Sequence, residues 1–163
     1  MSDADATFNS LVGDLDYPMF IVTTCAEGER AGCLIGFATQ TSIDPSRFLV
    51  CLSRSNHTYR VARRARTLAV HWVPADAADL AELFGGETGD AVDKFSRVAW
   101  HPGPGDAPIL GGCPNWFVGR ILERVGAGDH DAFLLEPVAA HRGAAEEEFT
   151  FHRARRIEPG HPA

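Results

Sequence analysis

Gly32-Cys-Leu-Ile-Gly-Phe-Ala-Thr-Gln-Thr-Ser-Ile-Asp-Pro-Ser-Arg-Phe-Leu-Val-Cys-Leu-Ser-Arg-Ser-Asn-His-Thr58 is the stretch that decides the fold. Two apolar runs, 32–43 and 48–52, predict strands joined by a turn at 44–46. From 38 to 42, small and hydroxyl-bearing residues replace the large apolar side chains of a packed strand. The following segment, 53–58, offers hydroxyl, amide and guanidinium groups, with backbone N–H groups as well if a helix begins near Asn56. These are the groups that bind an anion such as a phosphate ester.

Composition predicts one globular domain. The chain has 163 residues, 45% of them hydrophobic, so we expect a single domain over 1–163 with its core at about 15–140 and a C-terminal strand and tail over 141–163. A net charge of -7 argues against nucleic acid or an anionic membrane as partner. The sequence has no apolar window of about 18 residues and no signal-peptide pattern at its start, which favours a cytoplasmic location.

The order of patterns along the chain predicts a mostly β fold, an antiparallel barrel with short inserted helices, rather than a doubly wound parallel sheet. We expect the first helix to lie against the body, the proline-rich 101–108 to be a loop without regular structure, and 158–163 to be frayed. The expected helices are 5–15, 56–65, 76–84 and 90–95. The expected strands are 17–25, 31–43, 48–52, 67–73, 115–125, 131–139 and 149–157.

Several common site motifs are absent from the sequence. There is no glycine-rich dinucleotide or nucleotide fingerprint and no Gly-x-Ser-x-Gly elbow. The seven histidines never stand two or four apart, and the four cysteines show no Cys-x-x-Cys spacing, so we expect no metal site and free thiols. His130, in a turn between two strands, can titrate near neutral pH and reach a ligand, although a solvated turn residue fits equally well.

The motifs in their order resemble the flavin reductase-like family of FMN-binding split β-barrels, which includes the reductase components of two-component monooxygenases. The resemblance covers about residues 15–140. The pieces that carry it are Tyr-Pro-Met-Phe-Ile-Val-Thr-Thr at 17–24, Gly32, Ser-Ile-Asp-Pro at 42–45, Cys-Leu-Ser-Arg-Ser-Asn-His-Thr at 51–58, Lys-Phe at 94–95, Ala-Pro-Ile-Leu at 107–110, Gly-Asp-His at 128–130 and Glu-Pro-Val at 136–138.

The resemblance implies a Greek-key-like antiparallel barrel with a flavin site. By the resemblance, one set of residues, the ring group, passes along the flavin ring, and a second set, the phosphate group, holds the phosphate. Lys94 and Phe95 close over the cofactor, and His130 is the catalytic residue near the nicotinamide. The sequence departs from the family pattern at 34–38, where two side-chain hydroxyls are missing and Phe37 takes a shifted position. The ring group is Ile35, Gly36, Phe37, Ala38, Thr39, Gln40, Thr41 and Ser42, and the phosphate group is Ser53, Arg54, Ser55, Asn56, His57 and Thr58.

The resemblance further implies an FMN-dependent NAD(P)H:flavin reductase, a homodimer that passes reduced flavin to a separate monooxygenase. The sequence does not fix FMN against FAD, or NADH against NADPH. The alternatives are a flavin-binding or related electron-transfer or sensor module without NAD(P)H turnover, and a barrel without a cofactor.

Overall fold

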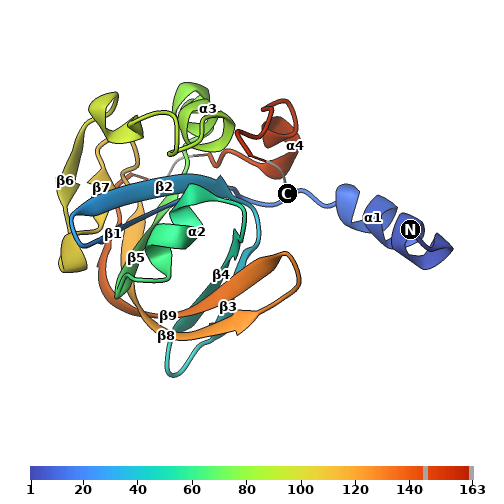
Figure 1. Ribbon diagram of the computed structural model, residues 1–163, viewed down its shortest axis with the longest axis horizontal. Coiled ribbons are helices and arrows are strands. Elements are labelled where there is room, and N and C mark those ends of the chain that lie inside the picture. The colour runs from blue at the N-terminus through green and yellow to red at the C-terminus, as the bar shows by residue number, and fades with distance from the viewer. Residues whose placement is uncertain (145–146, 162–163) are drawn as a thin grey trace.

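Seven strands form one antiparallel sheet in the order β2-β1-β5-β8-β9-β4-β3 in the computed structural model, which describes residues 1–144 and 147–161 (Figure 1). The predicted mostly β architecture is therefore confirmed. The strands are β1 (Phe20–Ala26), β2 (Glu29–Ile35), β3 (Ala38–Ser42), β4 (Arg47–Ser53), β5 (Thr67–Trp72), β8 (Trp116–Gly126) and β9 (His130–His141).

The connection between β2 and β3 shows that this sheet closes into a barrel. These two strands are the opposite edges of the sheet, yet only Gly36 and Phe37 separate them in the chain. The three Cα–Cα steps from Ile35 to Ala38 span at most about 11 Å, so the end of β2 and the start of β3 lie close together and the two edges of the sheet meet there. The prediction of one continuous strand over 31–43 was wrong, because the chain leaves β1 at Ile35 and pairs with β4 from Ala38 onward.

The barrel interior is apolar, and most of its residues come from the predicted strands. Phe20 and Val22 of β1 point into it, while Ile21 packs on the outside with Phe84. Strand β1 is thus buried on both faces, which explains its nearly unbroken apolar sequence. The interior residues are Phe20, Val22, Cys33, Ile35, Val50, Leu52, Tyr59, Ala62, Leu68, Val70, Phe117, Phe133 and Leu135.

Two of the predicted helices are confirmed, the first with shorter bounds and the second shifted two residues toward the C-terminus. Helix α2 (His57–Ala62) begins after Asn56, whose side-chain oxygen accepts a hydrogen bond from the Thr58 N–H at 2.9 Å. Helix α3 (Ala78–Gly86) packs its Phe84 ring on Gly32 of β2, where an added Cβ would lie 2.8 Å from the ring. The expected helix at 90–95 reduces to the 3₁₀ turn η1 (Lys94–Ser96).

The proline-rich loop is more regular than predicted. It contains β6 (Trp100–Pro102), the 3₁₀ turn η2 (Pro104–Asp106) and β7 (Pro108–Leu110). Pro102 and Pro108 stand directly opposite each other in this small two-stranded sheet. Since neither proline can donate a hydrogen bond, their pairing needs none at that position, and the prediction of an irregular loop was wrong.

The C-terminal segment is not the predicted edge strand over 149–157. Phe149 makes backbone hydrogen bonds to Met19 and Val73, and the chain then turns into the short helix α4 (Phe151–Ala154). The segment continues along the body to His161, which has hydrogen-bond partners. The expected fraying is therefore also wrong for residues 158–161. Residues 162–163 lie outside the described part of the chain.

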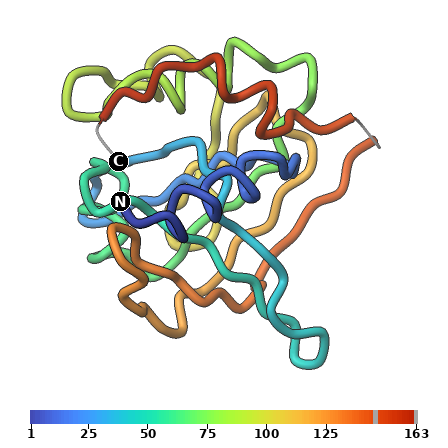
Figure 2. Tube along the Cα trace, turned by 90° about the vertical axis from the view of Figure 1, so that its right-hand side faces the viewer, coloured from blue at the N-terminus to red at the C-terminus, as the bar shows by residue number. Residues whose placement is uncertain are grey.

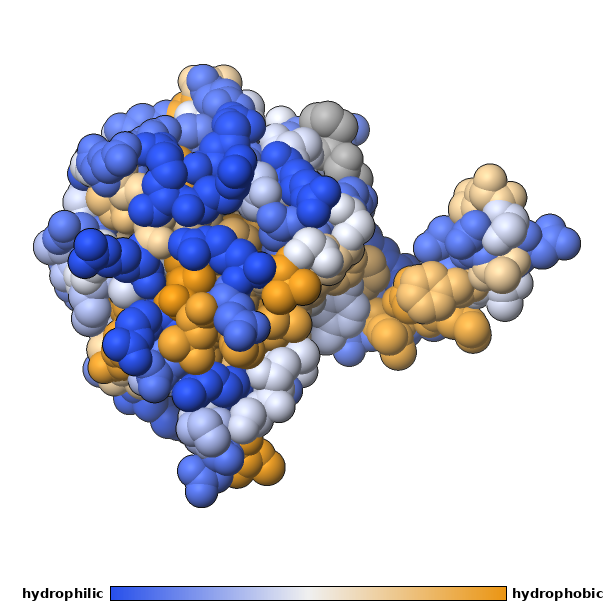
Figure 3. Space-filling view, turned by 60° about the horizontal axis from the view of Figure 1, so that its bottom comes forward, coloured by the Kyte–Doolittle hydropathy of each residue, from blue (hydrophilic) through white to orange (hydrophobic). Residues whose placement is uncertain are grey.

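Helix α1 (Asp3–Gly13) projects from the body and buries none of its residues (Figures 1 and 3). A capping box between Ser2 and Asp5 starts it. Phe8, Leu11 and Leu15, at and just beyond the helix, are more than half exposed, so the prediction that this helix lies against the body was wrong. Among the described residues, no helix combines the length and the apolar character needed to cross a bilayer.

Candidate functional site

A cavity of about 210 Å³ lies where the β2–β3 connection passes the ends of β4 and β9. Half of its twelve lining residues belong to the set predicted from the sequence: Ile35, Gly36, Phe37, Ser53, Asn56 and His130. The structure therefore brings the predicted ring segment, the predicted phosphate segment and the predicted histidine to one place. The other lining residues are Tyr17, Met19, Leu34, Cys51, Phe151 and His161.

Part of the cavity lining is an aromatic wall formed by Tyr17 and Phe151. The Tyr17 and Phe151 rings stack with their centroids 4.8 Å apart and their planes 8° from parallel. A Cβ added at Gly36 would lie 2.8 Å from the Tyr17 ring and 3.1 Å from the Met19 sulfur, so only glycine permits this close packing. The Phe37 side chain is 57% exposed and remains available to a planar ligand.

Another corner of the cavity is polar. Ser53 and Ser55 join their hydroxyls at 2.9 Å. The Asn56 amide donates to Nε2 of His161 at 3.0 Å, and Nδ1–H of His161 donates to the Ser55 hydroxyl at 3.3 Å. Because α2 has only six residues, its dipole is small, and the hydroxyl and amide groups are the main donors for an anion here. No group of metal-ligating side chains occurs among residues 1–144 and 147–161.

His130 borders the cavity from the start of β9, directly opposite Ser53 of β4. Its Nδ1–H donates to the Asp129 carboxylate at 2.6 Å, and this hydrogen bond holds the pKa of Asp129 below its usual range. The imidazole also lies 5.1 Å from the Phe37 ring, centroid to centroid. The carboxylate and the aromatic ring together fix the orientation of the histidine.

Other residues predicted for the cofactor site lie elsewhere. The Arg54 guanidinium is held by the Asp131 carboxylate at 2.7 Å, and Thr58 is 1% exposed and does not line the cavity. The 39–42 segment belongs to the β3–β4 hairpin, which protrudes from the body (Figure 2). Its last three residues border a separate open hollow of about 550 Å³.

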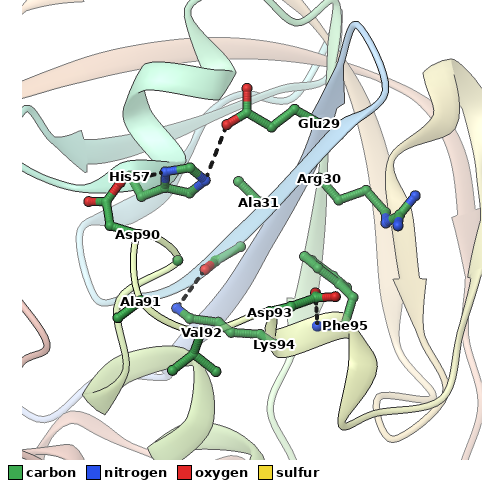
Figure 4. A pocket seen from close by; sticks show the side chains of 12 residues that line it. Glu29, Arg30, Ala31, His57, Asp90, Ala91, Val92, Asp93, Lys94 and Phe95 are labelled. Atoms are coloured by element: carbon green, nitrogen blue, oxygen red, sulfur yellow. Dashed lines mark hydrogen bonds and ion pairs between the residues drawn. The ribbon is translucent and has the colours of Figure 1, made fainter.

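Lys94, Phe95 and His57 line a second cavity, of about 410 Å³, beside β2 (Figure 4). The Lys94 ammonium donates to the carbonyls of Gly32 at 2.9 Å and Phe84 at 3.2 Å, and burial lowers its pKa. His57 contacts the carboxylates of Asp90 at 3.1 Å and Glu29 at 3.5 Å. These three residues therefore do not join the residues around the 210 Å³ cavity.

Sequence reasoning missed half of the cavity lining. Tyr17, Met19 and Cys51 fall inside the motifs that carry the family resemblance, so their positions gave a usable signal. Phe151 and His161 gave none, because each comes from a segment predicted to have another structure.

Comparison with known proteins gives concordant matches. The family model described as "Flavin reductase like domain" matches residues 12–160. The FMN reductase (NADH) RutF of Serratia proteamaculans is 32% identical over 135 residues, which are 83% of this chain and 77% of that protein. The structure of the NADH:FAD oxidoreductase SgcE6 of Streptomyces globisporus is similar, with a TM-score of 0.83 at 25% identity, covering 93% of this chain and 90% of that one. A second SgcE6 structure, in complex with NAD and FAD fragments, has a TM-score of 0.79 at 26% identity, covering 90% and 87%.

Proposed function

The chain belongs to the flavin reductase-like family, with its split-barrel fold, and on that premise we propose that it is an NADH-dependent flavin reductase with FMN as its flavin. The observation that carries the proposal is one cavity whose lining joins an aromatic wall, a hydroxyl and amide corner, and the oriented His130. The RutF and SgcE6 relatives support NADH as the reductant.

The donor set of the cavity fits FMN. The ring system of FMN is planar and largely apolar, while its other end is a phosphate that accepts hydrogen bonds. A cavity of 210 Å³ is smaller than the roughly 300–1,000 Å³ usual for ligand sites, so part of the flavin lies beyond this protomer's walls. A homodimer that covers the remainder, and a separate monooxygenase that takes reduced flavin in the cytoplasm, complete the proposal.

Each group has a defined task in this proposal. The wall of Tyr17 and Phe151 and the Gly36–Phe37 connection position the ring, and the Ser55 and Asn56 side chains hold the phosphate. When bound, flavin supplies the acceptor, at N5, for a hydride from nicotinamide C4. The protein has to orient the two rings and exclude water, and no side chain has to act as a base. The residues predicted on β3 and beside Lys94 have no part in this version of the site.

Flavin binding and turnover give the first test. We expect the purified protein to bind FMN, with a shifted visible absorbance spectrum, and to oxidise NADH only when flavin is present. The spectrum is recorded after FMN is added and again after NADH is added. A protein that binds FMN but leaves both NADH and NADPH unoxidised would instead be an electron-transfer or sensor module, and one that binds no flavin would contradict the whole proposal.

The role of His130 gives the second test. Replacing His130 with alanine is expected to slow NADH oxidation about tenfold or more, because the nicotinamide loses an orienting contact, while the Kd for FMN changes less than about threefold. His141→Ala is the matched control, because that exposed histidine lies at the other end of β9. Equal NADH oxidation by the two variants would remove His130 from the site.

A further inference from the structure

The C-terminal segment 155–161 is seated on the body and ends in the polar corner of the cavity. Ile157 packs against the outer hydrophobic cluster, and the Gly160 N–H donates to the Gly85 carbonyl at 3.4 Å. A Cβ added at Gly160 would lie 2.7 to 2.9 Å from backbone atoms of residues 86–88. Backbone cannot yield as a flexible side chain can, so this close packing fixes where His161 lies.

His161 engages the side-chain groups that the phosphate needs. Its Nε2 accepts from the Asn56 amide, and its Nδ1–H donates to the Ser55 hydroxyl. The other end of the Asn56 amide is already taken, because its oxygen accepts from the Thr58 N–H. Of the two N–H groups of this amide, one donates to His161 and the other is directed to the Cys33 sulfur. A phosphate oxygen that accepts from the first of these N–H groups must therefore occupy the position where the imidazole nitrogen now lies.

We propose that His161 is an internal competitor for the flavin phosphate, so that segment 155–161 acts as a strap that FMN displaces when it binds. This inference rests on the proposed function, since it concerns the same cavity. The strap lowers the affinity for flavins that carry a phosphate and leaves the ring wall untouched. It also keeps the hydroxyl and amide corner hydrogen-bonded when no flavin is bound, which avoids unpaired polar groups.

Two variants release the strap in different ways. His161→Ala removes the imidazole, and Gly160→Ala lifts the segment from residues 86–88 while it keeps the imidazole. Because FMN no longer has to replace two hydrogen bonds, we expect each variant to bind FMN about 5- to 30-fold more tightly than the wild type. Riboflavin, which lacks the phosphate, is expected to bind all three proteins within about twofold. His141→Ala, at the exposed histidine that ends β9, is the control and should match the wild type.

Calorimetric titration of the full chain with FMN and with riboflavin measures these affinities. Trypsin gives a second readout: Arg155 and Arg156 are exposed at the start of the strap, and saturating FMN should speed cleavage there in the wild type. If the wild type binds FMN and either variant binds it equally or more weakly, the strap is wrong and the proposed function stands. If no variant binds FMN or riboflavin, both proposals fall. If His161→Ala and Gly160→Ala bind FMN and the wild type does not, the result supports the strap.

Discussion

Replacing Lys94 with alanine is expected to lower the free energy of unfolding by about 3–5 kcal/mol, because the substitution empties a buried site and leaves two carbonyls unpaired. Lys94 is 4% exposed. Its ammonium binds the Gly32 carbonyl on the outer edge of β2 and the Phe84 carbonyl in the last turn of α3. Strand edges and helix C-termini both present carbonyls without partners, and one cation satisfies both here.

The matched variant is Lys94→Met, which keeps the length and apolar stem of the side chain without the charge. Since it refills the space and removes the desolvation cost of a buried cation, we expect it to lose clearly less stability than the alanine variant. Urea unfolding at pH 7 measures both. A Lys94→Met protein that is fully stable but has lost FMN binding would return Lys94 to the cofactor site and contradict the structural role.

The strands were predictable because burial sets their pattern. The runs at 17–25, 48–52 and 67–73 are apolar for the reason that β1, β4 and β5 are central strands of the sheet. The break between β2 and β3 was not predictable, because Gly36 lies in a run of apolar residues with no proline or charge to mark an end. The break depends on where Tyr17 and Met19 pack, which is a tertiary contact.

The candidate site was predictable where it is local in sequence. Residues 35–37 and the 53–56 segment adjoin in space because the β2–β3 connection lies beside β4, through the hydrogen bond from the Cys51 N–H to the Phe37 carbonyl. His57 follows Asn56 directly, yet it points away toward Glu29 and Asp90. Two residues that are adjacent in the sequence at the start of a short helix can point their side chains in different directions, and the sequence alone does not determine these directions. Long-range partners determine them.

His71 gives the fold a specific sensitivity to acid. The imidazole is fully buried, its Nδ1–H donates to the Ile21 carbonyl at 3.0 Å, and its Nε2 accepts from the Leu110 N–H at 3.1 Å. One neutral tautomer thus joins β1, β5 and β7. Burial lowers the pKa of His71 from 6.5 to about 4, and a proton on Nε2 would oppose the Leu110 N–H.

The sign of the pH effect follows from that lowered pKa. Below pH 6.5 the unfolded chain binds a proton at His71 that the folded chain does not bind until about pH 4, so stability falls as the pH falls through this window. The loss attributable to His71 between pH 7 and pH 4 is about 3 kcal/mol.

His71→Gln keeps an acceptor for the Leu110 N–H but cannot titrate, so its unfolding free energy should fall by about 3 kcal/mol less over the same range. Urea unfolding at pH 7, 5 and 4 measures the difference, and His141→Gln, at an exposed histidine, should retain the wild-type dependence. Identical pH dependence in the wild type and His71→Gln would mean that protonation of this imidazole does not oppose folding, and acid sensitivity would then belong to the carboxylates alone.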